Sequence, residues 1–232
     1  MIVTIKRLIG FTGLAGLFWL LGHQRANAPT SQVRIKGVPA YYQYPQLPTG
    51  CEATSLAMLL SWGLGEEVSK YTVADALSKG DKVHQAGGEW KGANPNKTFV
   101  GDPYTDSDDG SYGVFEGPIL EAIEMYMPGK GIDLTGEPFD ALLDIVRSGK
   151  PVLAWTTLEQ QETYYGLSWT DEAGDVIDWY ENEHAVVLTG VTGDQVIAHD
   201  PHTGKAEYYD RKLFERNWQS MGGRAVMLNI GN

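Results

Sequence analysis

One cysteine stands out among the residues that could do chemistry. Cys51 is the only cysteine in 232 residues and lies in the segment LPTGCEATSLAMLL, residues 47–60. Thr49 and Glu52 have the spacing of a capping box, which predicts a helix that begins here and carries Cys51 in its first turn. A thiol at a helix N-terminus has a lowered pKa, because the unpaired amides and the helix dipole favour the thiolate. We therefore predict that Cys51 is a nucleophile.

Two further observations concern the same segment. Gly50 leaves room for the backbone of a substrate to approach, so we predict that it contributes to substrate binding. One cysteine cannot form an internal disulfide, and an odd thiol in an exported chain indicates either an intermolecular bridge or a reactive group. The alternative is that Cys51 is a small apolar residue of the core, which is what most lone cysteines are.

A nucleophilic cysteine needs a base, and the base needs a group that orients it. Three of the five histidines lie in NEHAVVLTGVTGDQVIAHDPHTG, residues 182–204. HAVVLTGV and QVIAHD read as two strands of a hairpin around the turn TGD. A three-residue loop, TGD, would place His184 diagonal to Asp200 on one face, whereas a two-residue loop would place them on opposite faces. With the longer loop, His184 and Asp200 form the base and orienting group of a triad; the alternative is a strand histidine satisfied by backbone.

The sequence also allows two metal sites, but it supports them less well than the catalytic triad. His199, Asp200 and His202 could ligate a metal, but strand alternation points His199 away from Asp200. The acidic run DPYTDSDDG, residues 102–110, does not match an EF-hand loop and is predicted to be an acidic surface loop, with another calcium geometry left open. We therefore expect no metal and no other cofactor. His84 lies in a polar stretch and is predicted to be a surface histidine.

Composition and charge restrict the partners. The formal net charge is −12 and the sequence pI is about 4.8, so the surface repels phosphate backbones and nucleic-acid binding is not expected. The length and apolar content suit one sizeable globular domain. We expect a peptide or protein substrate and a monomer.

The N-terminal segment has the order of a secretory signal. Lys6 and Arg7 precede the uncharged run LIGFTGLAGLFWLLG, and ANA supplies small residues for a signal peptidase. The apolar run is shorter than the ~20 residues that span a bilayer comfortably, which favours cleavage over a retained anchor. We predict a signal peptide or N-terminal membrane anchor at 1–28, a linker at 29–37 and one domain at 38–232. The protein is expected to be secreted or extracytoplasmic, with membrane or cell-wall association through its N-terminus.

The helices and strands that position these residues are predicted in the order of an α+β fold, with the helices first and the antiparallel strands later. Helices are predicted at 51–63, 72–80, 117–127 and 138–150, and most strands follow them. The strands are predicted at PVLAWTTL, a polar hairpin from LSWTD to VIDWYE, HAVVLTGV, QVIAHD, KAEYYD and RAVMLNI. Residues 86–113 form a long irregular stretch, which is expected to be either one wall of a cleft or a disordered excursion.

The chain resembles a known family in three of these segments. QYPQLPTGCEATSLAML, HAVVLTGV and HDPHTG look like the cysteine peptidases related to the bacteriocin-processing, double-glycine-leader peptidases of the papain-type clan. The resemblance covers about residues 38–230 and implies a papain-like fold, with a helical part that carries the nucleophile and an antiparallel sheet that carries the base. It implies Cys51 as nucleophile, His184 as base and Asp200 as third member.

The resemblance also implies a glutamine upstream of the cysteine that stabilises the oxyanion. Gln43 matches the exported members, and Gln46 is closer to the spacing in other clan members. The bacteriocin-processing enzymes have D-C-G at the cysteine, whereas Gly50 and Glu52 flank Cys51, so leader processing is not carried over to this chain.

We therefore predict an exported cysteine peptidase that cleaves amide bonds through a Cys-His-Asp triad. Two alternatives remain open at this point. The first is a non-catalytic module on the same fold that binds peptide or cell-wall material. The second is an acyltransferase or transpeptidase that uses the same three residues.

Overall fold

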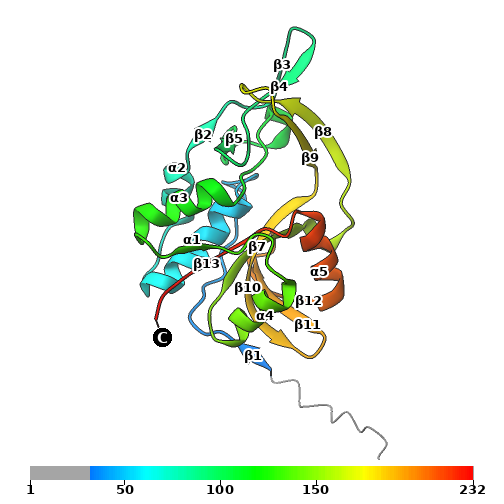
Figure 1. Ribbon diagram of the computed structural model, residues 1–232. Helices are drawn as coiled ribbons and strands as arrows, with labels where there is room; N and C mark the ends of the chain where they lie inside the picture. The colour runs from blue at the N-terminus through cyan, green and yellow to red at the C-terminus, as the bar shows by residue number, and fades with distance from the viewer. Residues whose placement is uncertain (1–31, 232) are drawn as a thin grey trace, which may run out of the picture. The chain divides into compact units, whose positions relative to one another are not determined.

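The computed structural model describes residues 32–231, so the predicted signal at 1–28 lies outside the described residues. Its centre is a seven-stranded antiparallel sheet (Figure 1). The strands follow the order β12 (Lys205–Asp210), β11 (Gln195–Asp200), β10 (Glu183–Thr192), β7 (Val152–Thr157), β13 (Ala225–Leu228) and β6 (Gly131–Asp133), and β1 (Val33–Arg34) also pairs with β10. The sheet therefore begins inside the segment that we predict as a linker.

Helices cover both faces of this sheet. On one face lie α1 (Cys51–Leu64) and α3 (Glu116–Tyr126), with α2 (Lys70–Ala76) against α1. On the other lie α4 (Phe139–Arg147) and α5 (Arg211–Ser220). Leu153 and Trp155 of β7 pack with the first group, and Val152 and Ala154 pack with the second. Burial on both faces explains why the central strands read as continuous apolar runs.

The start of α1 differs from the predicted capping box. Gly50 is the N-cap residue, and no side chain caps the helix. Thr49 instead donates a hydrogen bond to the carbonyl of Thr105, at 2.8 Å. Glycine is required at 50 because a Cβ there would lie 2.7 Å from the Cβ of Leu47. The helix is buried on all sides from Cys51 to Ser61, rather than on the single apolar face that its spacing suggests.

The hairpin of β10 and β11 has a turn of two residues, not the predicted three. Thr192 pairs with Gln195 across the turn. A bulge at Thr189 then shifts the register, so that Val187 pairs with His199. The bulge supplies the extra residue that we expected in the loop, and His184 and Asp200 end on the same face for that reason.

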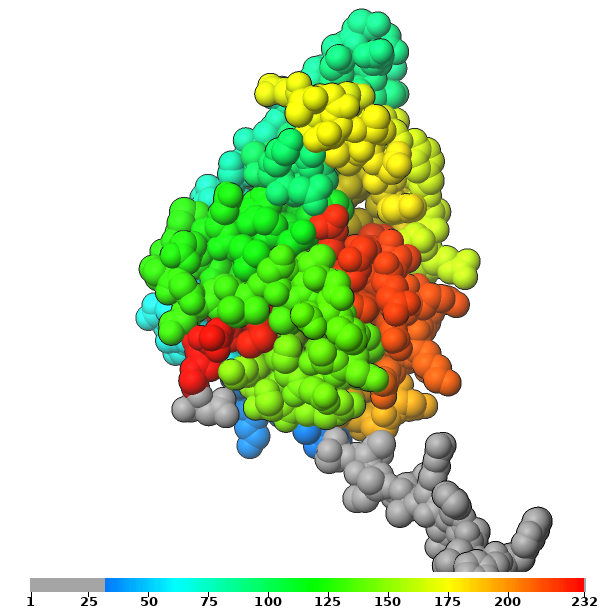
Figure 2. Space-filling view, viewed as in Figure 1, coloured from blue at the N-terminus to red at the C-terminus, as the bar shows by residue number. Residues whose placement is uncertain are grey.

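A second, smaller sheet lies at one end of the described unit. Its four strands are β3 (His84–Ala86), β4 (Glu89–Lys91), β8 (Tyr165–Thr170) and β9 (Val176–Tyr180), and the tips of the two hairpins protrude in Figure 2. Trp169 and Trp179 form its core with Tyr112. Beside it, β2 (Lys79–Gly80) pairs with β5 (Phe99–Val100), and the 3₁₀ turns are η1 (Ser107–Asp109) and η2 (Leu158–Gln160).

The fold is a mixture of helix and sheet, and most predicted elements are present at nearly their predicted positions. Two differences are clear. The helix predicted at 72–80 begins earlier and ends at Ala76, and α5 was not predicted. The segment of α5, RKLFERNWQS, is mostly polar and buries only Phe214, Asn217 and Trp218. No helix within residues 32–231 combines the length and apolar character needed to cross a bilayer.

Candidate active site

The candidate nucleophile and base line one cavity of about 150 Å³. Cys51 comes from the first turn of α1, and His184 comes from the second residue of β10. The remaining wall comes from four other segments of the chain. The lining residues are Gln43, Tyr44, Pro48, Thr49, Cys51, Ser107, Ser111, Tyr112, Leu158, Trp179, Glu181, Glu183 and His184. The cavity therefore lies where the start of α1 meets the start of β10.

Backbone and side-chain contacts hold α1 against β10 at this point. Ser55, one turn after Cys51, donates a hydrogen bond to the carbonyl of Ala185 at 3.0 Å. Since Ala185 directly follows His184, this bond holds the start of α1 beside the strand that carries the imidazole.

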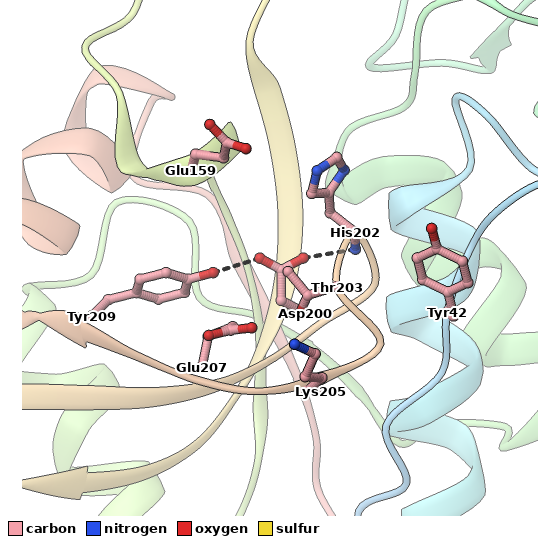
Figure 3. A pocket seen from close by; sticks show the side chains of 8 residues that line it. All are labelled: Tyr42, Glu159, Asp200, His202, Thr203, Lys205, Glu207 and Tyr209. Atoms are coloured by element: carbon pink, nitrogen blue, oxygen red, sulfur yellow. Dashed lines mark hydrogen bonds between the residues drawn. The ribbon is translucent and has the colours of Figure 1, made fainter.

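His184 and Asp200 form a buried pair. His184 Nε2 and Asp200 Oδ1 are 2.7 Å apart, and the two residues are 3% and 2% exposed. Asp200 also accepts hydrogen bonds from the Tyr209 hydroxyl and the His202 amide, as Figure 3 shows. Burial alone would raise the pKa of Asp200, but the bonds from His184, Tyr209 and His202 and the charge of His184 lower it to about 2.

The pair has a consequence for the imidazole. Asp200 occupies Nε2 of His184, so Nδ1 is the ring nitrogen left for another partner. A carboxylate on one ring nitrogen fixes the tautomer and the orientation of the ring. The arrangement can therefore present a base to the cavity that Cys51 also lines.

The thiol itself differs from the prediction. Cys51 is buried, and its Sγ donates a hydrogen bond to Glu52 Oε2 at 3.2 Å. Burial raises the pKa of Cys51 well above its ordinary value, and the charges of Glu52 and Glu183 raise it further. The helix terminus does not lower it as we predicted, because two carboxyl groups and the low dielectric act in the opposite direction.

These carboxyl groups, Glu52 and Glu183, are the site residues that the sequence analysis missed. Glu52 is fully buried, and its Oε1 accepts a hydrogen bond from the amide of Val114 at 2.7 Å. Burial raises the pKa of Glu52 to about 7, and burial followed by the charge of Glu52 raises the pKa of Glu183 well above its usual range. The sequence shows only that each glutamate directly adjoins Cys51 or His184; the pattern of apolar residues does not indicate that Glu52 is buried.

The two candidate glutamines lie in different surroundings. Gln43 is 3% exposed and lines the cavity, whereas Gln46 is exposed and accepts a hydrogen bond from Lys70. Gln43 Nε2 donates to the carbonyls of Leu47 and Pro48. Gly50 is buried and is not among the residues that line the cavity. The geometry thus brings together Cys51, His184, Asp200 and Gln43, and it gives Gly50 a role in the turn before α1.

The long irregular stretch 86–113 forms part of the cavity wall, which was one of its two predicted alternatives. Ser107, Ser111 and Tyr112 line the cavity. The stretch is tied to the start of α1 through the bond from Thr49 to Thr105. It therefore contributes to the site rather than extending away from it.

The predicted alternative metal set is not assembled. His199 Nδ1 bonds the carbonyl of Pro39 at 2.9 Å, while Asp200 bonds His184. Within residues 32–231, the one set of ligand-type atoms that lie within 4.8 Å of one another belongs to Cys51, Glu52 and Glu183. That set lies outside the acidic run at 102–110.

A larger cavity, of about 580 Å³, reaches the same pair at Asp200. Figure 3 shows Asp200 at its centre, with Glu159 on one side and Glu207 and Lys205 on the other. Glu159 has a positive φ of 54°, a conformation that is uncommon for a residue other than glycine. His184 thus lines the smaller cavity, and its partner Asp200 lines the larger one.

The raised pKa of Glu52 predicts how stability depends on pH. Between its ordinary value of 4.5 and about 7, the unfolded chain loses this proton while the folded protein keeps it. Stability therefore falls as pH rises through this window. Glu52→Gln removes the titrating proton, so we expect the free energy of unfolding of this variant to fall less between pH 5 and 8.

Urea denaturation at a series of pH values measures this effect. Glu66→Gln, at an exposed glutamate, serves as the matched control and should keep the wild-type slope. An unchanged slope in Glu52→Gln would show that Glu52 is already ionised in the folded protein at pH 5.

Comparison with known proteins gives three findings. Residues 35–226 match the Peptidase_C39 like family. The uncharacterised protein YvpB of Bacillus subtilis (strain 168) is 34% identical over 210 residues, which are 87% of this chain and 81% of that protein. A crystal structure from Bacillus anthracis, described as a candidate C39-like peptidase, superposes with a TM-score of 0.77 at 33% identity, over 87% of this chain and 99% of that one.

Proposed function

The chain belongs to the Peptidase_C39 like family, and from this premise we propose that it is a cysteine peptidase that cleaves amide bonds through Cys51, His184 and Asp200. The observation that carries the proposal is the meeting of two distant segments. Cys51 and His184 line one cavity, and Asp200 holds the far nitrogen of the imidazole at 2.7 Å.

In the proposed reaction, His184 Nδ1 takes the proton of the Cys51 thiol as the sulfur attacks the carbonyl carbon. The C–N bond then breaks, and the imidazolium returns its proton to the leaving amine. Water next attacks the thioester, again with its proton passing to His184, and releases the acid and the free thiol. Asp200 stabilises the imidazolium in both halves.

The oxyanion needs donors beside the sulfur. The first amides of a helix have no intrahelical partner, so the Cys51 amide is one proposed donor. Gln43 is the other, after its side-chain amide leaves the carbonyls of Leu47 and Pro48. One donor of this kind contributes about 3 kcal/mol to the transition state.

The proposal extends to the fold and the location. A buried helix that carries the nucleophile, packed on an antiparallel sheet that carries the base, is the layout of papain-type enzymes. We propose the papain-like fold on that ground. Secretion or extracytoplasmic location rests on the order of charge, apolar run and small residues in the first 28 residues.

A transferase or transpeptidase would use the same three residues, and a binding module on the same fold would keep the cavity without turnover. Labelling of Cys51 with a thiol-directed reagent separates the module from the enzymes, because a binding module has no need of a reactive thiol.

Alkylation with iodoacetamide, followed by mass spectrometry, tests this proposal. Burial and the neighbouring carboxyl groups raise the pKa of Cys51, but we expect the thiol of the native protein to be modified at neutral pH because His184 takes its proton as the sulfur attacks. His184→Ala should therefore slow the modification by about tenfold. The alkylation rate of Cys51 in the urea-unfolded wild type serves as the reference for an ordinary thiol. A native Cys51 that resists the reagent while the unfolded chain reacts would contradict the proposal.

A further inference from the structure

We propose that the Cys51 cavity accepts a positively charged side chain of the substrate, at the residue next to the scissile bond, with Glu183 as its counter-charge. This inference deepens the proposed peptidase function and rests on it. It names the substrate class as peptides with lysine or arginine at that position.

Glu183 lies in the right place for such a role. It directly precedes His184 on β10 and lines the cavity. One of its carboxylate oxygens lies within 4.8 Å of the ligand atoms of both Cys51 and Glu52. Its Oε1 is buried and has no hydrogen-bond partner among the described residues. A buried carboxylate oxygen without a hydrogen bond destabilises the protein, so we expect a bound ligand to donate a hydrogen bond to this atom.

The other polar atoms around it are nearly all used. Glu52 accepts from Val114 with one oxygen and from Cys51 with the other. Gln43 is 3% exposed, and its Nε2 donates to two carbonyls, while its Oε1 is buried without a partner. Among the buried side-chain oxygens of the cavity wall, Glu183 Oε1 and Gln43 Oε1 have no partner within the described residues, and both are acceptors. An ammonium or guanidinium group, which only donates, complements them.

The charged residues that line the Cys51 cavity also favour a cationic ligand. Glu181 and Glu183 line the cavity, and none of its lining residues is a lysine or arginine. The cation that acts on Glu183 is Arg224, which already pairs with Glu116 and stacks on Phe115.

The surroundings extend this negative field. The larger cavity, which is lined by the Asp200 partner of His184, has Glu159, Asp200 and Glu207 against the single cation Lys205, and the whole chain carries −12. A cleft lined by one sign of charge concentrates ligands of the other sign.

The protonation of Glu183 couples the binding of a cation to the release of a proton. Burial and then the charge of Glu52 raise the pKa of Glu183, which favours the protonated carboxyl group when no ligand is bound. A bound cation lowers that pKa, and the proton leaves as the ion pair forms. Binding of a cationic substrate should therefore release a proton to the buffer, whereas binding of its neutral analogue should not.

Two thiol-directed probes test the inference. Both are peptidyl acyloxymethyl ketones, with lysine in one and norleucine in the other beside the reactive ketone. We measure the second-order rate of Cys51 modification by mass spectrometry, and we expect lysine to react about tenfold or more faster in the wild type. Glu183→Gln changes the thiol in the same way for both probes, so we expect it to bring the ratio of the two rates near 1, and Glu66→Gln should leave the ratio unchanged.

The outcomes separate this inference from the proposed function. Equal rates in the wild type, or a lysine preference that survives Glu183→Gln, would overturn the cation site while leaving the peptidase intact. If neither probe nor iodoacetamide modifies Cys51, the peptidase fails. The cation site is then decided by NMR titration of Cys51→Ala with acetyl-Ala-Ala-Lys-amide and its norleucine analogue. Tighter binding of the lysine peptide supports the site, and equal binding overturns it.

Discussion

Replacing Cys51 with alanine is expected to abolish amide hydrolysis, with a loss of about 10⁴-fold or more in kcat. The sulfur is the atom that would form the covalent intermediate, and within the described residues it is the one thiol. The measurement is cleavage of a mixture of quenched fluorescent peptides that includes lysine and arginine at many positions. Hydrolysis that persists in the variant at the wild-type rate would show that another group does the chemistry.

The fold of this variant should remain intact. Alanine fits the first turn of a buried helix, and the bond from Ser55 to Ala185 that anchors α1 on β10 is not affected. Circular dichroism and thermal unfolding check this point. Cys51→Ser is a second variant of nearly the same size, and its activity should also be lost, because a serine hydroxyl is a much weaker nucleophile at this site than a thiol.

Replacing His184 with alanine is the second large effect, with an expected loss of about 10³-fold in kcat. The variant removes the proposed base and leaves Asp200 buried without its 2.7 Å partner. Breaking a buried pair in this way costs about 3–5 kcal/mol of stability. Activity is therefore measured well below the melting temperature of the variant, together with its free energy of unfolding.

His202→Ala is the matched control for this experiment. The ring of His202 lies 6.2 Å from that of His184, and its contact with Asp200 is through the main-chain amide, which alanine keeps. We expect the activity of His202→Ala to stay within a few-fold of the wild type. If His202→Ala lost as much activity as His184→Ala, the assignment of the base to His184 would be wrong.

The elements that carry the site follow from local sequence signals. The helix at Cys51 follows from the apolar spacing after Gly50, and the hairpin of β10 and β11 follows from β-branched residues around a glycine turn. Such signals act over a few residues, so one sequence contains them. We predicted the pairing of His184 with Asp200 from a three-residue loop, whereas in the structure a two-residue turn and a bulge at Thr189 bring the two residues to the same face. A bulge depends on the neighbouring strands, so the sequence of the hairpin alone does not reveal it.

The electrostatics of the site could not be predicted in the same way. The helix terminus alone indicated a lowered thiol pKa, but the structure buries Cys51 with Glu52 and Glu183 and so raises it. Glu183 reaches the thiol only because α1 packs against β10, and Glu52, which adjoins Cys51 on the helix, is buried by tertiary contacts such as its bond with the amide of Val114. The helix α5 was missed for a related reason. Its segment is mostly polar, and its two large buried residues, Phe214 and Trp218, are buried only by packing against the sheet.

The central claim is that Cys51 becomes covalently attached to the carbonyl of a peptide during the reaction. Acid quenching of the protein with a reactive peptidyl ester, followed by intact-protein and fragment mass spectrometry, measures this attachment directly. We predict that the mass of the acyl group appears on Cys51 in the wild type and decays on further incubation, and that it is absent from Cys51→Ala. A protein that cleaves the ester at full rate with no acyl group on Cys51, or that carries the acyl group elsewhere, would contradict the account.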